Sequence, residues 1–209
     1  MGRREWSTRT AKDRQDSATR AALLDAAEQL FAEQGCDQTS IALIAERAAV
    51  SRATFYVYFA SRAEVFHALA HRVRDEITAV QREAGRSSTT PQDVIRASIR
   101  AALAVYARKA RLLTVIRHQA LHDPEAASLW HELVELPTEI DARFLADLRR
   151  GHGARPAADD RLVAQVVTAA LLHLADEVAD GDAAGADGLD RTAEALVAVY
   201  ARLAGMDRA

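Results

Sequence analysis

Apolar residues recur every three or four positions along the chain, which is the spacing of one face of an α-helix. The pattern begins at Ala18 and predicts a first helix with Leu23, Ala27 and Phe31 on its apolar face. A long helix with the same spacing follows Arg62, and the remaining chain is predicted to be helical in the same way. The sequence therefore predicts an all-α fold of about nine helices.

Two short helices are predicted between residues 39 and 61, directly before the long one. Ser40 and Ser51 are N-cap residue types, and each precedes a short apolar spacing. Ser61 and Glu64 have the spacing of a capping box, which specifies where the next helix begins. This layout is that of a helix-turn-helix, in which the second helix presents its N-terminal residues to the major groove of DNA.

The last two predicted helices, around residues 162–178 and 189–203, carry many apolar side chains. One small domain cannot cover all of this surface, so the helices are expected to pack against those of a second copy of the chain. The residues predicted to form this homodimer interface are Val163, Val167, Leu171, Leu174, Leu196, Val197, Tyr200 and Leu203.

The segment from Ala22 to Leu69 contains LLDAAEQLFAEQG, TSIALIAERAAVS and RATFYVYFASRAEVF. These motifs closely resemble the DNA-binding domain of the tetracycline-repressor (TetR) family of bacterial transcriptional regulators. The resemblance implies base contacts from the start of the second short helix and phosphate contacts around it. The DNA-binding residues expected in this way are Ser40, Ala42, Ser51, Arg52, Ala53, Thr54, Tyr56, Tyr58 and Arg62.

The sequence departs from the family pattern at four positions, the simplest of which is Val65 in place of leucine. Ala49 replaces the usual glycine of the turn, and because alanine at positive φ costs about 1 kcal/mol, a slightly less left-handed turn is expected. Cys36 stands where an aromatic residue is common and is expected to be a small buried apolar residue. Arg62 replaces lysine, which keeps the charge and adds a fork that can hold a phosphate with two bonds.

Charge and composition suggest how the chain is organised. Basic and acidic residues balance up to residue 84, so the formal net charge of −3 lies in the remainder, which is not a nucleic-acid surface. We expect a basic, disordered arm over residues 1–17, a helix-turn-helix domain over 18–64 and a connecting helix over 65–84. Residues 85–209 are expected to form a helical domain for ligand binding and dimerisation.

The resemblance also implies an effector pocket among the middle helices. Its predicted lining is Tyr106, Ile116, Trp130, Leu133, Val134, Pro137, Phe144 and Leu172, which suggests an apolar or aromatic ligand. The expected function is that of a one-component transcriptional repressor, which binds a palindromic operator of double-stranded DNA as a homodimer and is released by a small effector.

Two other function classes have weaker support in the sequence. An enzyme or metal-binding protein is suggested only by the pairs His67/His71 and His118/His122, which lack the glutamate of H-E-x-x-H. A helical adaptor that binds only protein would not need arginine and tyrosine side chains around one exposed turn. No cofactor or metal is expected. The sequence contains no apolar run of about 18 residues and no signal-peptide pattern, so a cytoplasmic protein that binds no membrane is expected.

Overall fold

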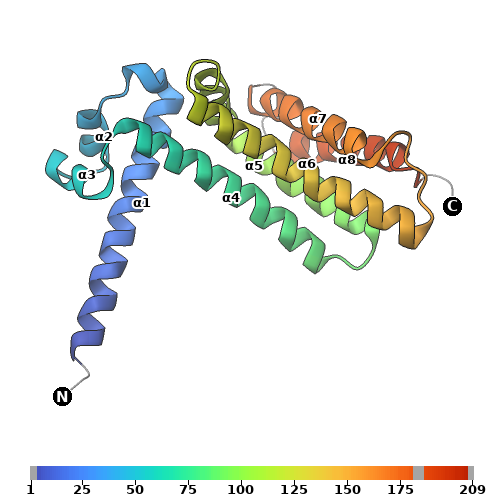
Figure 1. Cartoon of the computed structure of the whole chain (residues 1–209), viewed down its shortest axis with the longest axis horizontal. Coiled ribbons are helices and arrows are strands. Elements are labelled where there is room, and N and C mark those ends of the chain that lie inside the picture. The colour runs from blue at the N-terminus through green and yellow to red at the C-terminus, as the bar shows by residue number, and fades with distance from the viewer. Residues whose placement is uncertain (1–3, 181–185, 207–209) are drawn as a thin grey trace. The chain divides into compact units, whose positions relative to one another are not determined.

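The computed structural model describes residues 4–180 and 186–206, with the backbone alone for residues 4–17 and 186. This part of the chain contains no β-strand, so the predicted all-α fold class is confirmed. Its eight helices, against about nine expected, are labelled in Figure 1: α1 (Arg4–Gln38), α2 (Ile41–Arg47), α3 (Arg52–Tyr58), α4 (Arg62–Ser87), α5 (Pro91–Gln119), α6 (Pro124–His152), α7 (Asp160–Asp180) and α8 (Ala186–Leu203).

Helix α1 begins at Arg4, well before the start predicted at Ala18. The early segment lacks an apolar face, but its alanine, arginine, lysine, glutamate and glutamine residues favour helix. The expected basic arm over residues 1–17 stays a prediction. Residues 1–3 lie outside the described part, and only the backbone is described for residues 4–17.

The chain forms two compact units, Met1–His71 and Arg72–Ala209, and the change from one to the other falls within α4. In the first unit, the core is made by α1, α2, α3 and the start of α4. Its buried residues include Leu23, Ala27, Leu30, Phe31, Ile44, Ala45, Phe55, Phe59, Val65, Phe66 and Leu69. Arg47 of α2 holds α1 from outside this core, because its guanidinium donates to both carboxylate oxygens of Glu33 at 3.1 Å.

The turn between α2 and α3 is more strongly left-handed than expected. Ala49 has φ of 55°, so alanine adopts the conformation that the family usually gives to glycine. The hydrogen bonds around the turn explain why it does not relax: Ala49 N donates to Glu46 O at 3.0 Å, and Val50 N donates to Ala45 O at 2.9 Å. The fold therefore holds the strained residue in place at a cost of about 1 kcal/mol.

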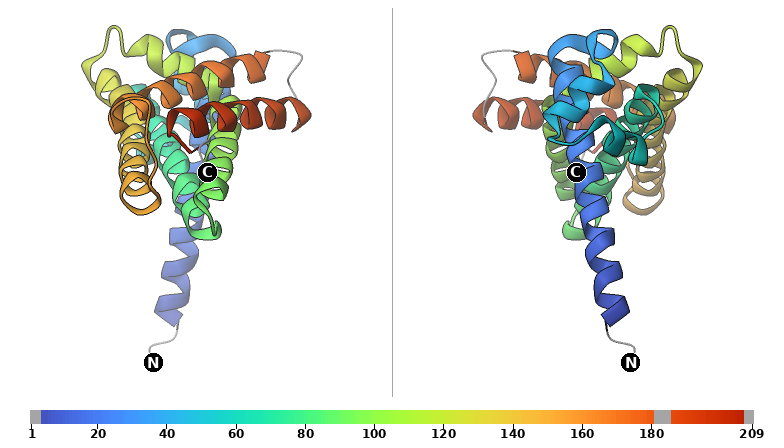
Figure 2. Two further views of the ribbon diagram at one scale, coloured as in Figure 1. Left: turned by 90° about the vertical axis from the view of Figure 1, so that its right-hand side faces the viewer. Right: turned by 90° about the vertical axis from the view of Figure 1, so that its left-hand side faces the viewer.

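In the second unit, α5 is the central helix and packs against α6, α7 and α8. Figure 2 shows α7 and α8 alongside each other, in agreement with their direct contact. Ion pairs hold the outside of this unit, among them Arg74 to Glu132 at 2.8 Å between α4 and α6, and Arg100 to Asp190 at 2.6 Å between α5 and α8.

The length and apolar composition of α7 contradict the expectation that the sequence contains no segment long and apolar enough to span a membrane. Within the described part of the chain, its 21 residues are the one helix long and apolar enough to do so by length and composition. The sequence prediction missed it because alanines, which count only weakly as apolar, fill the gaps between its valines and leucines. In the structure, α7 uses Val163, Val167 and Leu171 to pack within the second unit.

Candidate functional sites

Helix α3 has one exposed side and one buried side. Phe55 is fully buried, whereas Arg52, Ala53, Tyr56 and Val57 are exposed. We call these four residues the α3 face. It consists of the first turn of the helix and the residues one turn later, which is the part of a helix-turn-helix that can enter a major groove.

Arg52 and Tyr56 give the α3 face its hydrogen-bonding groups. Arg52 has no hydrogen bond or ion pair to any described residue, so all five of its N–H donors are available. Tyr56 is 54% exposed, and its ring packs edge-on against Phe55 with 5.6 Å between the ring centroids. The buried phenylalanine therefore orients the tyrosine hydroxyl outward.

Val57 belongs to the same face and was missed by the sequence reasoning. It is 76% exposed, which is unusual for valine in a folded domain. No role is expected of this residue from the sequence, because nothing in the motif singles out a valine between two tyrosines. An exposed branched side chain on a reading helix can contact the methyl group of thymine.

The other predicted DNA-binding residues have structural roles or lie at the edge of this face. Ser40 and Ser51 cap α2 and α3, accepting from Leu43 N at 3.2 Å and from Thr54 N at 3.0 Å. The Thr54 hydroxyl is hydrogen-bonded to that of Ser51 at 2.8 Å. Ala42 and Tyr58 are half-buried.

Arg62 is held inside the first unit, although the resemblance places it against a phosphate. Its Nη1 donates to the carbonyl oxygens of Cys36 at 2.6 Å, Asp37 at 3.2 Å and Thr39 at 3.0 Å. These carbonyls end α1 and lead into α2, so the guanidinium ties the start of α4 to the segment before the helix-turn-helix. A contact with phosphate would use only the N–H groups that remain.

Replacing Arg62 by alanine is expected to lower the free energy of unfolding by about 1.5–3 kcal/mol, because three carbonyls lose a charged donor. Chemical denaturation checks this, with Arg52→Ala as the matched control, since Arg52 has no partner in the described chain. If Arg62→Ala lowered DNA affinity and left the unfolding midpoint unchanged, its role would be that of a phosphate ligand alone.

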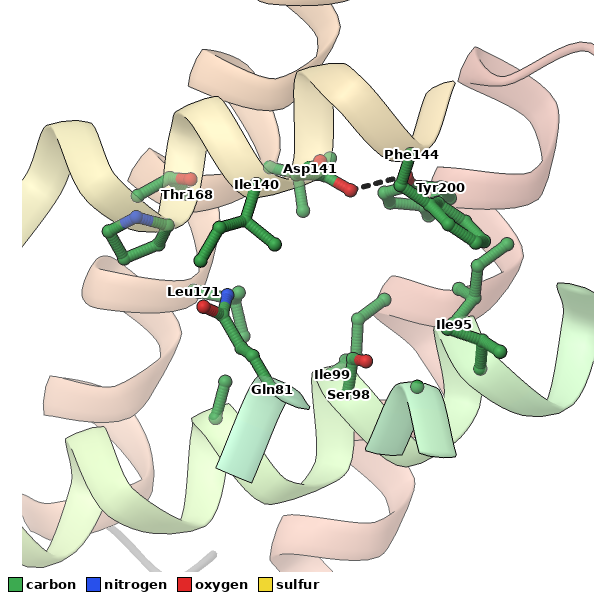
Figure 3. Close-up of a pocket in the computed structure, with 15 residues that line it drawn as sticks. Gln81, Ile95, Ser98, Ile99, Ile140, Asp141, Phe144, Thr168, Leu171 and Tyr200 are labelled. Carbon is green, nitrogen blue, oxygen red and sulfur yellow. Dashed lines mark hydrogen bonds between the residues drawn. The ribbon is translucent and has the colours of Figure 1, made fainter. Parts of the chain in front are cut away.

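The second unit contains a cavity of about 160 Å³, lined by residues from α4, α5, α6, α7 and α8. Figure 3 shows their side chains around the central space. The lining is mainly apolar, and its polar residues are Gln81, Ser98, Asp141, Thr168 and Tyr200. Thr168 bonds to the Thr138 hydroxyl at 3.2 Å, which joins α7 to α6 at one side of the cavity.

The structure brings together only part of the predicted effector set. Pro137 and Phe144 line this cavity, while Trp130 and Leu172 line a smaller one of about 40 Å³. Tyr106, Ile116 and Leu133 are buried in the core, and Val134 is half-buried and lines neither cavity. The periodic pattern identified these residues as inward-facing but could not indicate where packing leaves space.

Asp141 and Tyr200 form the polar end of the cavity. The Tyr200 hydroxyl donates to Asp141 Oδ1 at 2.5 Å, and the dashed line in Figure 3 marks this bond. Burial raises the pKa of the Asp141 carboxyl from 3.8 to about 6, even though the hydrogen bond from Tyr200 lowers it. Burial and the nearby carboxylate also raise the pKa of Tyr200, so the tyrosine remains the donor.

The raised pKa of Asp141 makes stability depend on pH. Between pH 3.8 and about 6 the folded chain keeps a proton that the unfolded chain releases, so stability falls as pH rises through this window and stays reduced above it. Asp141→Asn is expected to remove this dependence and to raise the free energy of unfolding at pH 8 by about 1–3 kcal/mol. Denaturation between pH 4 and 8 checks it, with Asp147→Asn as the control on the exposed side of α6. Equal slopes for the wild type and Asp141→Asn would contradict the expectation.

The predicted dimer residues need a correction. Val163, Val167, Leu171, Leu196 and Tyr200 are buried within the chain's own second unit and are not available to a partner. Leu174, Val197 and Leu203 are half-buried. Helical spacing identifies an apolar helix side, but it does not distinguish a side covered by the same chain from one covered by another.

The exposed apolar residues of α7 and α8 lie one position away from the predicted ones. Leu162 is 47% exposed, and Val166 and Val199 are each 48% exposed. Ala169 on α7 and Ala195 on α8 are exposed with them. We call these five residues the α7–α8 face.

The histidine pairs form no larger group. The spacing of His118 and His122 predicts that they lie on one face of a helix, and this is wrong. His118 lies in α5, which ends at Gln119, so His122 is in the turn that follows. Their ring centroids are 5.8 Å apart. Over residues 4–180 and 186–206, the structure contains no group of three or more histidine, cysteine, aspartate or glutamate side chains that could hold a metal.

Comparisons with known proteins agree with this geometry. Residues 23–69 match the family model for bacterial regulatory proteins of the tetR family. The chain is 30% identical over 135 residues to the HTH-type transcriptional repressor BepR of Brucella suis biovar 1, a match that spans 63% of this chain and 65% of BepR. The chain therefore covers just under two thirds of that relative.

Solved structures share the fold over nearly the whole chain. A TetR-like transcriptional regulator from Rhodococcus sp. RHA1 is 24% identical, with a TM-score of 0.69 over 90% of this chain and 96% of its own. The fatty acid degradation regulator FadR of Bacillus halodurans is 19% identical, with a TM-score of 0.72 over 87% and 93%. The matched residues 23–69 include the α3 face, and the helical unit that follows them in the chain shares the fold of these regulators. The chain is thus similar to bacterial regulatory proteins of the tetR family, in sequence over residues 23–69 and in fold over most of its length.

Proposed function

We propose that this protein is a one-component transcriptional repressor that binds a palindromic operator through the α3 face. The observation that carries the proposal is Arg52, which has no partner among the described side chains and lies beside the exposed Tyr56 and Val57. A guanidinium can donate two bonds to guanine O6 and N7, a tyrosine hydroxyl can donate to a phosphate, and valine can contact a thymine methyl. The relative BepR is itself described as a repressor.

The repressor would act as a homodimer joined through the α7–α8 face. Three large apolar side chains exposed on two neighbouring helices favour a permanent partner, because water contact with this surface is unfavourable. A two-fold dimer places two equal reading helices on one DNA molecule, and half-sites about 34–36 Å apart would match them. An operator with two-fold symmetry follows from this arrangement.

The cavity of the second unit would hold the effector. Helix α4 starts beside the helix-turn-helix with Arg62, and further along it contributes Gln81 and Gly85 to the cavity lining. A ligand that prefers one placement of α4 would therefore change the affinity for DNA. A switch of about 5–150-fold needs about 1–3 kcal/mol of coupling, and operator DNA must weaken effector binding by the same factor.

Titration of the purified protein with the palindromic DNA upstream of its own gene tests the proposal. Salt-dependent binding tighter than about 10⁻⁷ M, and at least about 10³-fold tighter than to unrelated DNA, is expected of a specific regulator. Equal affinity for both DNA molecules would refute operator recognition. The protein is proposed to act in the cytoplasm as a regulator, without a cofactor and without enzymatic activity. An adaptor that binds only protein would show no DNA binding in this assay.

A further inference from the structure

The cavity of the second unit contains two buried polar atoms that its fold does not use. Asp141 Oδ2 and Gln81 Oε1 are buried without a hydrogen-bond partner in the described part of the chain. Both residues line the cavity, Gln81 from α4 and Asp141 from α6. Buried polar atoms normally have partners, because a buried group without a hydrogen bond has lost its contact with water and gained nothing in return. A cavity with two unmet acceptors therefore lacks a donor.

No residue that the structure describes supplies a cation to the Asp141 carboxylate. Its recorded partner among the described residues is the hydroxyl of Tyr200. The nearby arginines are engaged with surface acids: Arg96 with Glu194 at 2.9 Å, Arg100 with Asp190 at 2.6 Å, and Arg143 with Glu139 at 3.5 Å. These three arginines, two from α5 and one from α6 itself, are thus paired with surface acids and not with Asp141.

The remaining lining sets the size and character of the missing partner. Ile95, Ile99, Ile140, Phe144 and Leu171 surround the space with apolar surface. The volume of about 160 Å³ is close to that of an apolar protein cavity of about 150 Å³ that binds benzene. The space therefore fits a molecule of about one ring, with its polar group at the end where Asp141 lies.

We propose that the cavity binds a small amine, in which an apolar or aromatic body lies among the isoleucines and one protonated amino group donates to Asp141. The amide of Gln81 gives a second contact, since it can turn to accept from the same group. The Asp141 carboxylate makes the cavity prefer a positively charged ligand to a neutral one, because an ammonium group next to the carboxylate stabilises its ionised form. This inference rests on the proposed function in identifying the cavity as the effector site, and it replaces the apolar ligand expected from the sequence with a cationic one.

Calorimetric titrations with benzylamine, 2-phenylethylamine and benzyl alcohol at pH 7.5 test the proposal. These probes have similar apolar bodies, and the alcohol lacks the charge. We expect the wild type to bind at least one amine about tenfold or more tightly than the alcohol. Asp141→Asn should lose this preference and Asp141→Glu should retain it, while Asp147→Asn serves as the control for the same change on the surface of α6.

Each other outcome contradicts the proposal. Equal affinity for amine and alcohol would show that the carboxylate does not select charge, as would a preference that survives in a folded Asp141→Asn variant. Failure of both amines to bind at 10 mM would also overturn it. Operator titration of the same preparations without ligand separates the two proposals: intact DNA binding without amine binding refutes only the ligand class, and amine binding without DNA binding refutes only the regulator.

Discussion

Glutamate substitution at both Val166 and Val199 is expected to give a folded monomer that no longer binds a palindromic operator tightly. Both side chains are about half exposed and lie on the α7–α8 face, so new carboxylates there would be solvated in the monomer but buried in a dimer. Each reading unit would then bind its half-site alone. Losing the second, intramolecular contact is expected to reduce operator affinity by about 10²–10⁴-fold.

Light scattering beside a DNA titration measures both effects. Leu121→Glu provides the matched control and should leave a dimer, because Leu121 is an apolar residue that is 73% exposed and lies outside the α7–α8 face. Glutamate at Leu196 should instead unfold the chain, because that side chain is buried in the protomer. A double variant at Val166 and Val199 that stays dimeric would exclude this face as the interface.

Combining Arg52→Ala with Tyr56→Phe is expected to abolish most sequence preference without changing stability. Arg52 has no partner within the described chain. Tyr56→Phe removes only the hydroxyl and keeps the ring that packs on Phe55. Loss of a guanine contact costs about 1–3 kcal/mol, which alone lowers specific affinity about 5–150-fold, and the lost hydroxyl adds to it. Binding to unrelated DNA should change much less.

The titration on specific and unrelated DNA should be run at two salt concentrations, since phosphate contacts set the salt dependence and base contacts the preference. Glu46→Gln is a suitable control, because Glu46 is an exposed residue of α2 outside the α3 face. An unchanged midpoint for the double variant on the specific DNA would show that another element reads the operator.

Local features of the first unit could be predicted from sequence because each depends on a few neighbouring residues. The caps at Ser40 and Ser51 form as expected. Half of the predicted capping box forms: Glu64 N donates to Ser61 Oγ at 3.1 Å, whereas Glu64 Oε2 accepts from the N–H of Ala60, one residue before the cap, at 2.6 Å. Short-range hydrogen bonds of this kind are specified by residue type and spacing alone.

Features that depend on distant segments could not be predicted in this way. The cavity results from the packing of five helices, so helical spacing identified Pro137 and Phe144 but gave no reason to select Asp141 among the many acidic residues. The role of Arg62 depends on carbonyls more than twenty residues earlier in the chain, which a motif cannot indicate. The residues of α7 that face a partner could not be predicted either, because the sequence does not show which side of the helix is covered by its own chain.

The burial of Cys36 makes the wild-type chain a convenient background for site-directed labelling. It is the only cysteine of the sequence, and burial raises the pKa of its thiol to about 12, so maleimide reagents at neutral pH should leave it unmodified. A cysteine introduced at an exposed position such as Asp37 would then carry the only spin label of each protomer. The distance between the two labels in a dimer would report directly how far apart the reading helices are held with and without an amine.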